Sequence, residues 1–149
     1  MAESRNGDSQ YGSDALDRIV ARLQRAENPR RRYEYVLWLS KKLPPLTSKT
    51  RSTAVKVKGC VSQVLVGGQL CGGHMCWQGD SDALITKGLL ALLIEGLEGL
   101  TSDEVQAVDP SFITDTGLNT SLTPSRANGF LNIFRTMQNI AAQQAEFTS

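Results

Sequence analysis

The 149-residue sequence contains few of the residue types on which common catalytic centres depend. Its single histidine, His74, has no serine and acid at a local spacing that would complete a hydrolytic triad. The phosphate-binding patterns GxGxxG and GxxxxGKS/T and the zinc-protease pattern HExxH are absent as well. We therefore do not expect a conventional hydrolase, kinase or dehydrogenase.

Long hydrophobic runs and a strong net charge are also missing. The apolar run from Gly88 to Ile94 ends at Glu95 and is far shorter than the about 20 residues that cross a bilayer. The formal net charge is +1, so we expect neither a membrane nor a nucleic acid as partner. The charge is uneven, with 13 basic and 6 acidic residues in 1–58 but 3 and 9 in 59–149, which indicates a dipolar surface.

Residues 1–12 are polar and predict a flexible tail, followed by a single domain over residues 13–149. The tail has no apolar run of a secretory signal and is not acid-poor like a transit peptide. We expect a cytoplasmic, reducing location. In such a compartment the three cysteines are more often reactive, metal-binding or inert than bridged.

Capping residues and hydrophobic periodicity predict an α+β fold, in which a three-stranded antiparallel sheet packs against helices. The strands are expected over residues 54–58, 62–66 and 74–78, with a glycine-rich connection over 67–73 and a loop over 47–53. Five helices are expected to begin at these caps: Ser13, Asn28, Asp80-Ser81-Asp82, Thr101 and Thr123.

Cys60 is the first candidate for chemistry. It follows Gly59 at an interruption between two strands, with Lys56 and Lys58 just upstream. Nearby cations favour the thiolate, which is the nucleophilic form of cysteine. A small buried apolar residue is the alternative interpretation, and the pattern leaves both open.

A zinc site is a weaker hypothesis for the spacing Cys71-x-x-His74-x-Cys76 with Cys60 as fourth ligand. Pairing residue 64 with residue 77 would place Cys60 about 16 Å from Cys76, too far to share one ion. We expect Cys71 to be an exposed turn residue and Cys76 a strand residue on the same face as His74.

Arg126 occupies about the third position of the last predicted helix, where its charge opposes the helix dipole. Either an ion pair with Asp80 or Asp82 offsets this, or the guanidinium faces an anion, a backbone carbonyl or a partner surface. The basic run Arg30-Arg31-Arg32 is better suited to an acidic protein partner than to nucleic acid.

Five segments, in order and with compatible spacing, carry a family resemblance that covers about residues 15–145. They are LPPL at 43–46, VKGCVSQV at 57–64, QGDSDA at 78–83, KGL at 87–89 and LTPSR at 122–126. The sequence resembles the SufE family of sulfur-acceptor proteins, whose fold is similar to the IscU scaffold.

The resemblance implies that Cys60 accepts sulfane sulfur as a persulfide from a PLP-dependent cysteine desulfurase of the SufS type. It also implies stimulation of that desulfurase and delivery of the sulfur to a Suf scaffold complex for iron–sulfur cluster assembly. The chain itself would act as a carrier rather than an enzyme, with no cofactor of its own. Homodimer formation stays open.

The matching motifs also imply roles around Cys60. Arg126 is expected to orient the Cys60 loop or contact the desulfurase, and Gly59 to act as a hinge. The supporting residues that the motifs supply are Ser62, Gln63, Asp80, Ser81 and Asp82. Cys71 and Cys76 lie outside the family's motifs, so an IscU-like metal or cluster scaffold using Cys60, Cys71, His74 and Cys76 is the alternative function.

Overall fold

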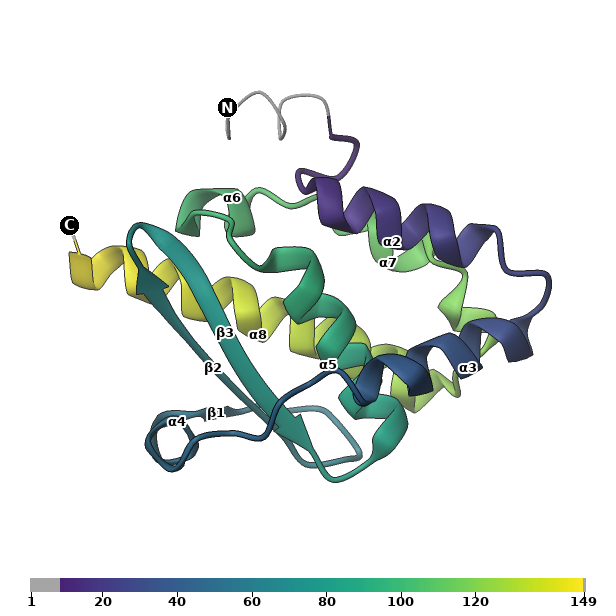
Figure 1. The fold of residues 1–149 in the computed structure, drawn as a ribbon, viewed down its shortest axis with the longest axis horizontal. Helices are drawn as coiled ribbons and strands as arrows, with labels where there is room; N and C mark the ends of the chain where they lie inside the picture. The colour runs from purple at the N-terminus through teal and green to yellow at the C-terminus, as the bar shows by residue number, and fades with distance from the viewer. Residues whose placement is uncertain (1–8, 149) are drawn as a thin grey trace.

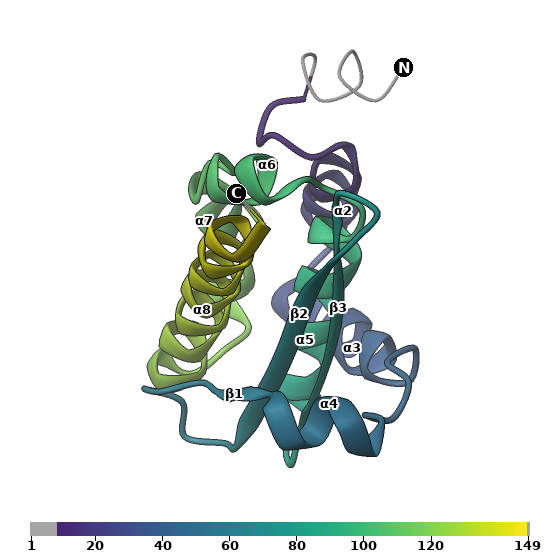
Figure 2. The same cartoon turned by 90° about the vertical axis from the view of Figure 1, so that its left-hand side faces the viewer.

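The computed structural model describes residues 9–148, and it has the expected α+β architecture (Figures 1 and 2). The sheet is antiparallel, with strand order β1-β2-β3. Its strands are β1 (Val55–Lys56), β2 (Val64–Cys71) and β3 (His74–Ser81). The described helices are α2 (Asp14–Gln24), α3 (Pro29–Ser40), α4 (Ser48–Thr53), α5 (Leu84–Leu97), α6 (Ser102–Gln106), α7 (Ser111–Asp115), the 3₁₀ helix η1 (Leu118–Thr120) and α8 (Pro124–Thr148).

The core lies between the sheet and its two longest helices. Helix α5 packs against β3, helix α8 packs against β2, and α2 and α3 cover α5 from outside. Figure 2 shows α5 and α8 running alongside the long β2–β3 hairpin. Alternate residues of the hairpin, such as Val64, Val66, Met75 and Trp77, are buried, as the period of two in a strand requires.

Helix α5 is buried on most of its circumference. Gly88 allows this, because a Cβ at that position would collide with the carbonyl oxygen of Val36 in α3. A Cβ on Gly96 would likewise collide with the side chain of Leu16 in α2. Both glycines are therefore sites of close helix approach.

Side-chain caps confirm four of the five predicted helix starts. Ser13, Asn28, Thr101 and Thr123 each accept a hydrogen bond from a backbone N–H of the first helical turn. The loop predicted over 47–53 is wrong. Thr47 accepts a hydrogen bond from the N–H of Thr50 at 3.1 Å and starts the short helix α4.

The glycine-rich connection predicted over 67–73 is also wrong, because β2 continues to Cys71. The turn consists of Gly72 and Gly73 alone, with φ of +63° and +89°, the geometry that tight hairpins require of both central residues. Gly68 belongs to the strand, where a Cβ would come within 2.5 Å of the Trp77 ring. Val64 accordingly pairs with Ser81 rather than with residue 77.

Tyr11 is buried although the predicted tail extends to residue 12. Its hydroxyl donates to Asp115 Oδ2 at 2.7 Å, and its carbonyl accepts from the N–H of Asp109 at 3.0 Å. Packing therefore begins before Ser13, while residues 1–8 of the expected tail lie outside the described residues. Within residues 9–148 no helix has the length and apolar character needed to cross a membrane.

Candidate functional site

Cys60 lies in the loop that joins β1 to β2, at the lower end of the molecule in Figure 1. The base of this loop is closed by a hydrogen bond of 2.9 Å from the N–H of Val57 to the carbonyl of Val64. Val57 is buried, whereas Val61 beside the cysteine is 70% exposed. The loop therefore has an anchored base and a tip that reaches solvent.

The thiol of Cys60 is half-buried against helix α8. Its Sγ lies 3.7 Å from the carbonyl oxygen of Gly129, to which it can donate. Glycine at position 129 leaves room for the thiol, because a Cβ there would lie in tight contact with the sulfur, at 3.4 Å. Burial raises the pKa of the Cys60 thiol. The thiolate predicted from Lys56 and Lys58 is therefore wrong for this conformation, and the buried interpretation describes the free protein better.

Gly59 has a backbone conformation that favours glycine, with φ of +81°. The side-chain amide of Asn132 donates to the Gly59 carbonyl at 3.0 Å. A Cβ on Gly59 would come within 2.5 Å of that amide nitrogen. This contact gives the cysteine loop a second attachment to α8, one that local sequence patterns did not indicate.

Arg126 joins the loop to two helices. Its Nη1 donates to the hydroxyl oxygens of Ser62 at 2.9 Å and Thr86 at 2.6 Å, and Thr86 donates to Ser62 at 3.3 Å. Thr86 is buried in the first turn of α5. The guanidinium at the start of α8 is therefore bonded to Ser62, which lies two residues beyond Cys60 along the chain.

The ion pair considered between Arg126 and Asp80 or Asp82 is wrong. Within the described part of the chain, Asp80 instead lies 3.5 Å from Arg51 and 3.3 Å from Lys87. Arg126 is held by the neutral hydroxyls of Ser62 and Thr86.

The acidic segment after β3 does not cap α5 as predicted. Asp80 and Ser81 are the last residues of β3, and α5 follows Ala83 without a side-chain cap. Asp82 Oδ1 instead accepts from the N–H of Gln63 at 3.0 Å, while its own N–H donates to the Gln63 carbonyl at 3.2 Å. This two-way contact fixes the end of the cysteine loop. The Ser81 hydroxyl accepts from the N–H of Ala83 at 3.3 Å.

The four residues of the alternative scaffold hypothesis do not gather. Cys71 and Cys76 are joined in a disulfide with a Cα–Cα distance of 6.0 Å, which leaves Cys60 as the free cysteine. No group of three or more potential metal ligands occurs among residues 9–148. The expectation of unbridged cysteines is wrong because the longer strand and tighter turn bring Cys71 beside Cys76.

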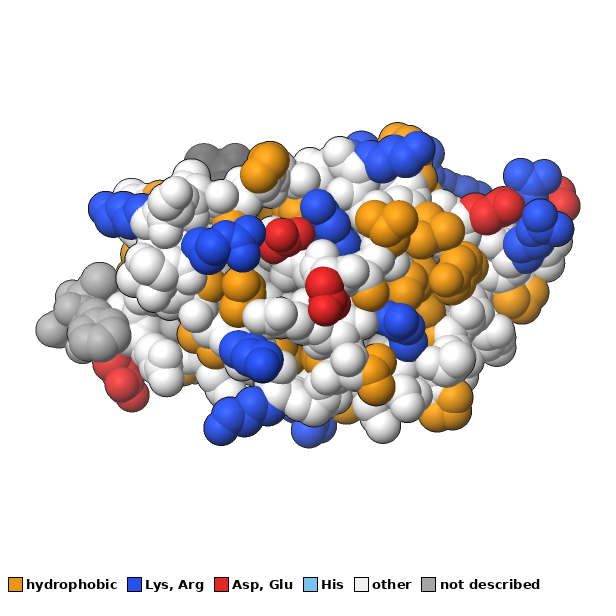
Figure 3. Space-filling view, turned by 90° about the horizontal axis from the view of Figure 1, so that it is seen from below, with side chains coloured by type: hydrophobic (Ala, Val, Ile, Leu, Met, Phe, Trp, Pro, Cys, Tyr) orange, Lys and Arg blue, Asp and Glu red, His pale blue; other side chains and the backbone are white. Residues whose placement is uncertain are grey.

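Hydrophobic and basic side chains gather on the face shown in Figure 3, which is the underside of Figure 1, with few acidic ones between them. The connections β1–β2 and β3–α5 both lie at this end of the molecule. Val61 in the first connection and Leu84 at the start of α5 are two of the most exposed large apolar side chains, at 70% and 67%. The end of the molecule that carries the cysteine loop therefore exposes two large apolar side chains.

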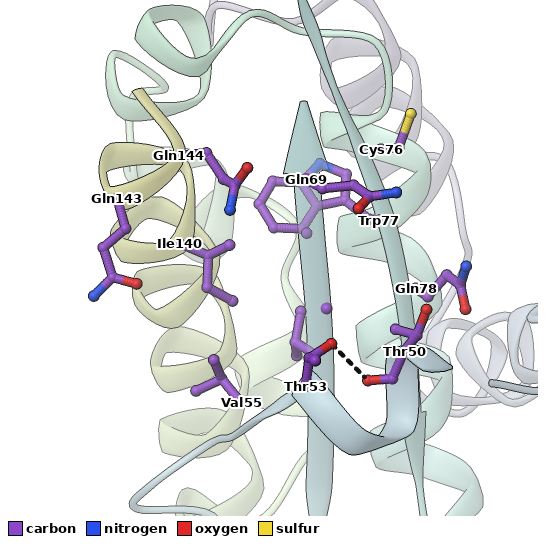
Figure 4. Close-up of a pocket in the computed structure, with 13 residues that line it drawn as sticks. Thr50, Thr53, Val55, Gln69, Cys76, Trp77, Gln78, Ile140, Gln143 and Gln144 are labelled. Atoms are coloured by element: carbon purple, nitrogen blue, oxygen red, sulfur yellow. Dashed lines mark hydrogen bonds between the residues drawn. The ribbon is translucent and has the colours of Figure 1, made fainter. Parts of the chain in front are cut away.

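A separate pocket of about 330 Å³ lies along β2 and α8 (Figure 4). Trp77 and Ile140 form its apolar wall, and Thr50, Thr53 and Gln143 supply polar groups. Cys60 does not line this pocket, and its thiol lies against α8 instead.

Comparisons with known proteins agree on one family. The SufE family model, described as an Fe-S metabolism associated domain, matches residues 17–141. An uncharacterized SufE-like protein of Synechocystis sp. is 54% identical over 123 residues, which cover 83% of this chain and 77% of that protein.

Two further relatives are longer. SufE-like protein 1, chloroplastic/mitochondrial, of Arabidopsis thaliana is 40% identical over 124 residues, covering 83% of this chain and 33% of that protein. The cysteine desulfuration protein SufE of Plasmodium vivax is 37% identical over 115 residues, covering 74% of this chain and 46% of that protein. The chain thus spans a third to a half of these two relatives.

The fold is also found in a solved structure. The solution structure of a hypothetical protein from Thermus thermophilus matches with a TM-score of 0.79 at 24% identity, covering 92% of this chain and 98% of that one.

Proposed function

Because the chain belongs to the SufE family, we propose that it accepts sulfane sulfur on Cys60 from a cysteine desulfurase and delivers it for iron–sulfur cluster assembly. The donor is a PLP-dependent enzyme of the SufS type, and the recipient is a Suf scaffold complex. The chain acts as a carrier and as an activator of the desulfurase. The cytoplasmic location and the oligomeric state stay predictions.

The observation that carries the proposal is the position of the free thiol. Cys60 is on a loop that is anchored at both ends, by Val57 with Val64 and by Gln63 with Asp82, and that rests on α8 through few contacts. A loop of this kind can leave its helix without disturbing the core, because its tip contributes no fully buried side chain.

The transfer step is a displacement at sulfur. The Cys60 thiolate attacks the terminal sulfur of the donor persulfide, a new S–S bond forms, and the bond to the donor sulfur breaks. The donor cysteine leaves as a thiolate, and the proton of Cys60 passes to solvent or to a base of the partner. No net oxidation occurs, since one sulfane sulfur simply changes carrier.

Burial of Cys60 gives the free protein a resting form. The raised pKa keeps the thiol protonated and therefore slow to react with stray electrophiles. When the loop moves away from Gly129 into the donor's site, that burial is lost and the thiolate becomes accessible. We assign Gly59 the hinge and Arg126 the positioning of the loop, through Ser62.

The proposal is tested by desulfurase activity. Purified SufS-type enzyme with cysteine is assayed for alanine release, with and without the chain. Wild type should increase the turnover, whereas Cys60→Ser should not, because it cannot remove the persulfide. A Cys71→Ser/Cys76→Ser double variant is the matched control and should stimulate like wild type. Full stimulation by Cys60→Ser would reject sulfur acceptance on this residue.

A further inference from the structure

We propose that Cys71 and Cys76 form a second reactive site, a reversible dithiol–disulfide couple at the end of the β2–β3 hairpin that exchanges with dithiol reductants. The site is separate from Cys60 and does not depend on the sulfur-transfer role. It accounts for the two cysteines that the family's motifs leave unexplained.

The register of the hairpin places the two cysteines side by side. Cys71 pairs with His74 and Gln69 pairs with Cys76, so the cysteines are diagonal neighbours on the same face of the sheet. Their Cα atoms are 6.0 Å apart, within the usual range for a disulfide. The backbone therefore allows the bond to open and close without a change in strand pairing.

The hairpin end is also held without the bridge. The N–H of Met75 donates to the carbonyl of Leu100 at 2.8 Å, and the N–H of Gly99 donates to the carbonyl of Met75 at 3.3 Å. The N–H of Leu70 donates to Gln144 Oε1 at 3.4 Å. These contacts tie both strands to the body of the protein. The reduced form should therefore keep the hairpin.

The bridge is accessible to a reagent from solvent. Cys71 is exposed next to the exposed residues Gly72, Gly73 and His74, and Cys76 is partly exposed. Figure 4 shows Cys76 pointing away from Ile140 and the Trp77 ring, on the outer face of the sheet. An incoming thiolate thus meets the sulfur of Cys71 first.

The exchange balances with a dithiol as reductant. Its thiolate attacks Cys71 Sγ, a mixed disulfide forms, and Cys76 leaves as a thiolate. The second thiol of the reductant then attacks its own mixed-disulfide sulfur and releases Cys71. Two electrons and two protons pass to the cysteine pair, and the reductant becomes a disulfide. The exposed His74 is directly opposite Cys71 in the register, and its Nδ1 lies 3.3 Å from the carbonyl oxygen of Gly72.

The couple is distant from the sulfur-carrying loop. The loop joins β2 at Val64, and seven residue steps along the strand place Cys71 about 23 Å farther on. Cys60 and the pair therefore cannot react with each other inside one chain. Changes at the hairpin end should leave the contacts of Cys60 with α8 intact.

The test uses a Cys60→Ser variant, in which only the pair can react. The folded protein is equilibrated without denaturant in mixtures of reduced and oxidised dithiothreitol, quenched with acid, unfolded and alkylated, and its intact mass is measured. We expect the population to pass from two alkyl groups per chain to none as the mixture becomes oxidising, with little singly alkylated protein. Adding Cys76→Ser to this variant gives the matched control, which should carry one alkyl group throughout.

Two outcomes would overturn the proposal. Two alkyl groups at the oxidising end would mean that no bridge forms, and none at the reducing end would mean that the bridge is closed to solvent reductants. This result can be distinguished from a failure of the proposed function. If the wild type carried no sulfur on Cys60, the redox titration of Cys71 and Cys76 would still give the same result.

Discussion

The side-chain amide of Asn132 donates a hydrogen bond of 3.0 Å to the carbonyl oxygen of Gly59, the residue before the free cysteine. The two residues are 73 positions apart in the sequence. Together with the approach of Cys60 Sγ to Gly129 and the hydrogen bond from Arg126 to Ser62, this bond holds the cysteine loop on α8.

Removing the Asn132 amide should make Cys60 more reactive. Asn132→Ala removes one of the three contacts that hold the loop on α8, so the thiol should be less buried and its raised pKa should fall toward the ordinary value. In a Cys71→Ser/Cys76→Ser background, iodoacetamide should alkylate Cys60 several-fold faster at neutral pH, and the midpoint of the pH–rate curve should move down. Asn139→Ala, exposed on the same helix, is the control. Identical curves for both variants would contradict this role of Asn132.

Replacing Gly59 should destabilise the fold more than replacing a turn glycine. Gly59→Ala introduces a Cβ at φ +81° that also meets the Asn132 amide, whereas Gly72→Ala introduces one at φ +63° with nothing within 4 Å. The shared backbone strain is about 1–2 kcal/mol, and Gly59→Ala should cost more than that in free energy of unfolding, measured by urea titration. Equal losses in the two variants would show that the Asn132 contact adds nothing.

Arg126 should affect both stability and sulfur transfer. Arg126→Ala removes hydrogen bonds to Ser62 and Thr86, which should lower the free energy of unfolding by about 1–2 kcal/mol. If the loss of these bonds raises the free energy of the transfer-competent loop position by a comparable amount, transfer to Cys60 should slow about tenfold.

Arg126→Lys, which keeps a positively charged donor group, should fall between the wild type and Arg126→Ala in single-turnover transfer. Arg135→Ala, exposed on the same helix, should behave like the wild type. A normal transfer rate for Arg126→Ala would remove the positioning role.

Tyr11 should make stability depend on pH in the alkaline range. Burial, followed by the hydrogen bond to Asp115, raises the pKa of Tyr11 from its ordinary value of 10.0 to about 12. The contribution of the protonated hydroxyl is therefore complete below pH 10 and is lost as the pH rises toward 12. Tyr11→Phe should lose about 1.5 kcal/mol at pH 8 and less at pH 11, by chemical denaturation. Tyr33→Phe, at an exposed position, is the control, and a difference independent of pH would contradict this account.

Much of the architecture could be predicted from local sequence signals. Helix caps at Ser13, Asn28, Thr101 and Thr123 were found because each accepts from a backbone N–H within its own first turn. The α+β class followed from the change of hydrophobic period between segments. Cys60 and Arg126 were found from their local positions, one at a strand interruption and one near a helix start, and from the motifs that resemble the family.

The remaining features depend on contacts between distant residues. Gly67 and Gly68 resemble turn residues in the local sequence, but both lie in β2. A Cβ on Gly67 would collide with the Thr50 side chain, and a Cβ on Gly68 would collide with the Trp77 ring. The strand register decides which cysteines lie side by side. The disulfide could therefore not be predicted from a turn that was taken to span residues 67–73. The contact between Cys60 and Gly129 joins residues that are 69 positions apart, so no local sequence pattern indicates it.

The most direct test of the central claim is the site at which sulfur appears after one turnover. The wild-type chain is mixed with a SufS-type desulfurase, PLP and cysteine, digested without reductant, and its peptides are measured by mass spectrometry. We predict an added mass of about 32 Da, that of one sulfur atom, on the peptide that contains Cys60. A peptide without this addition, or with the addition only on those containing Cys71 or Cys76, would contradict the account.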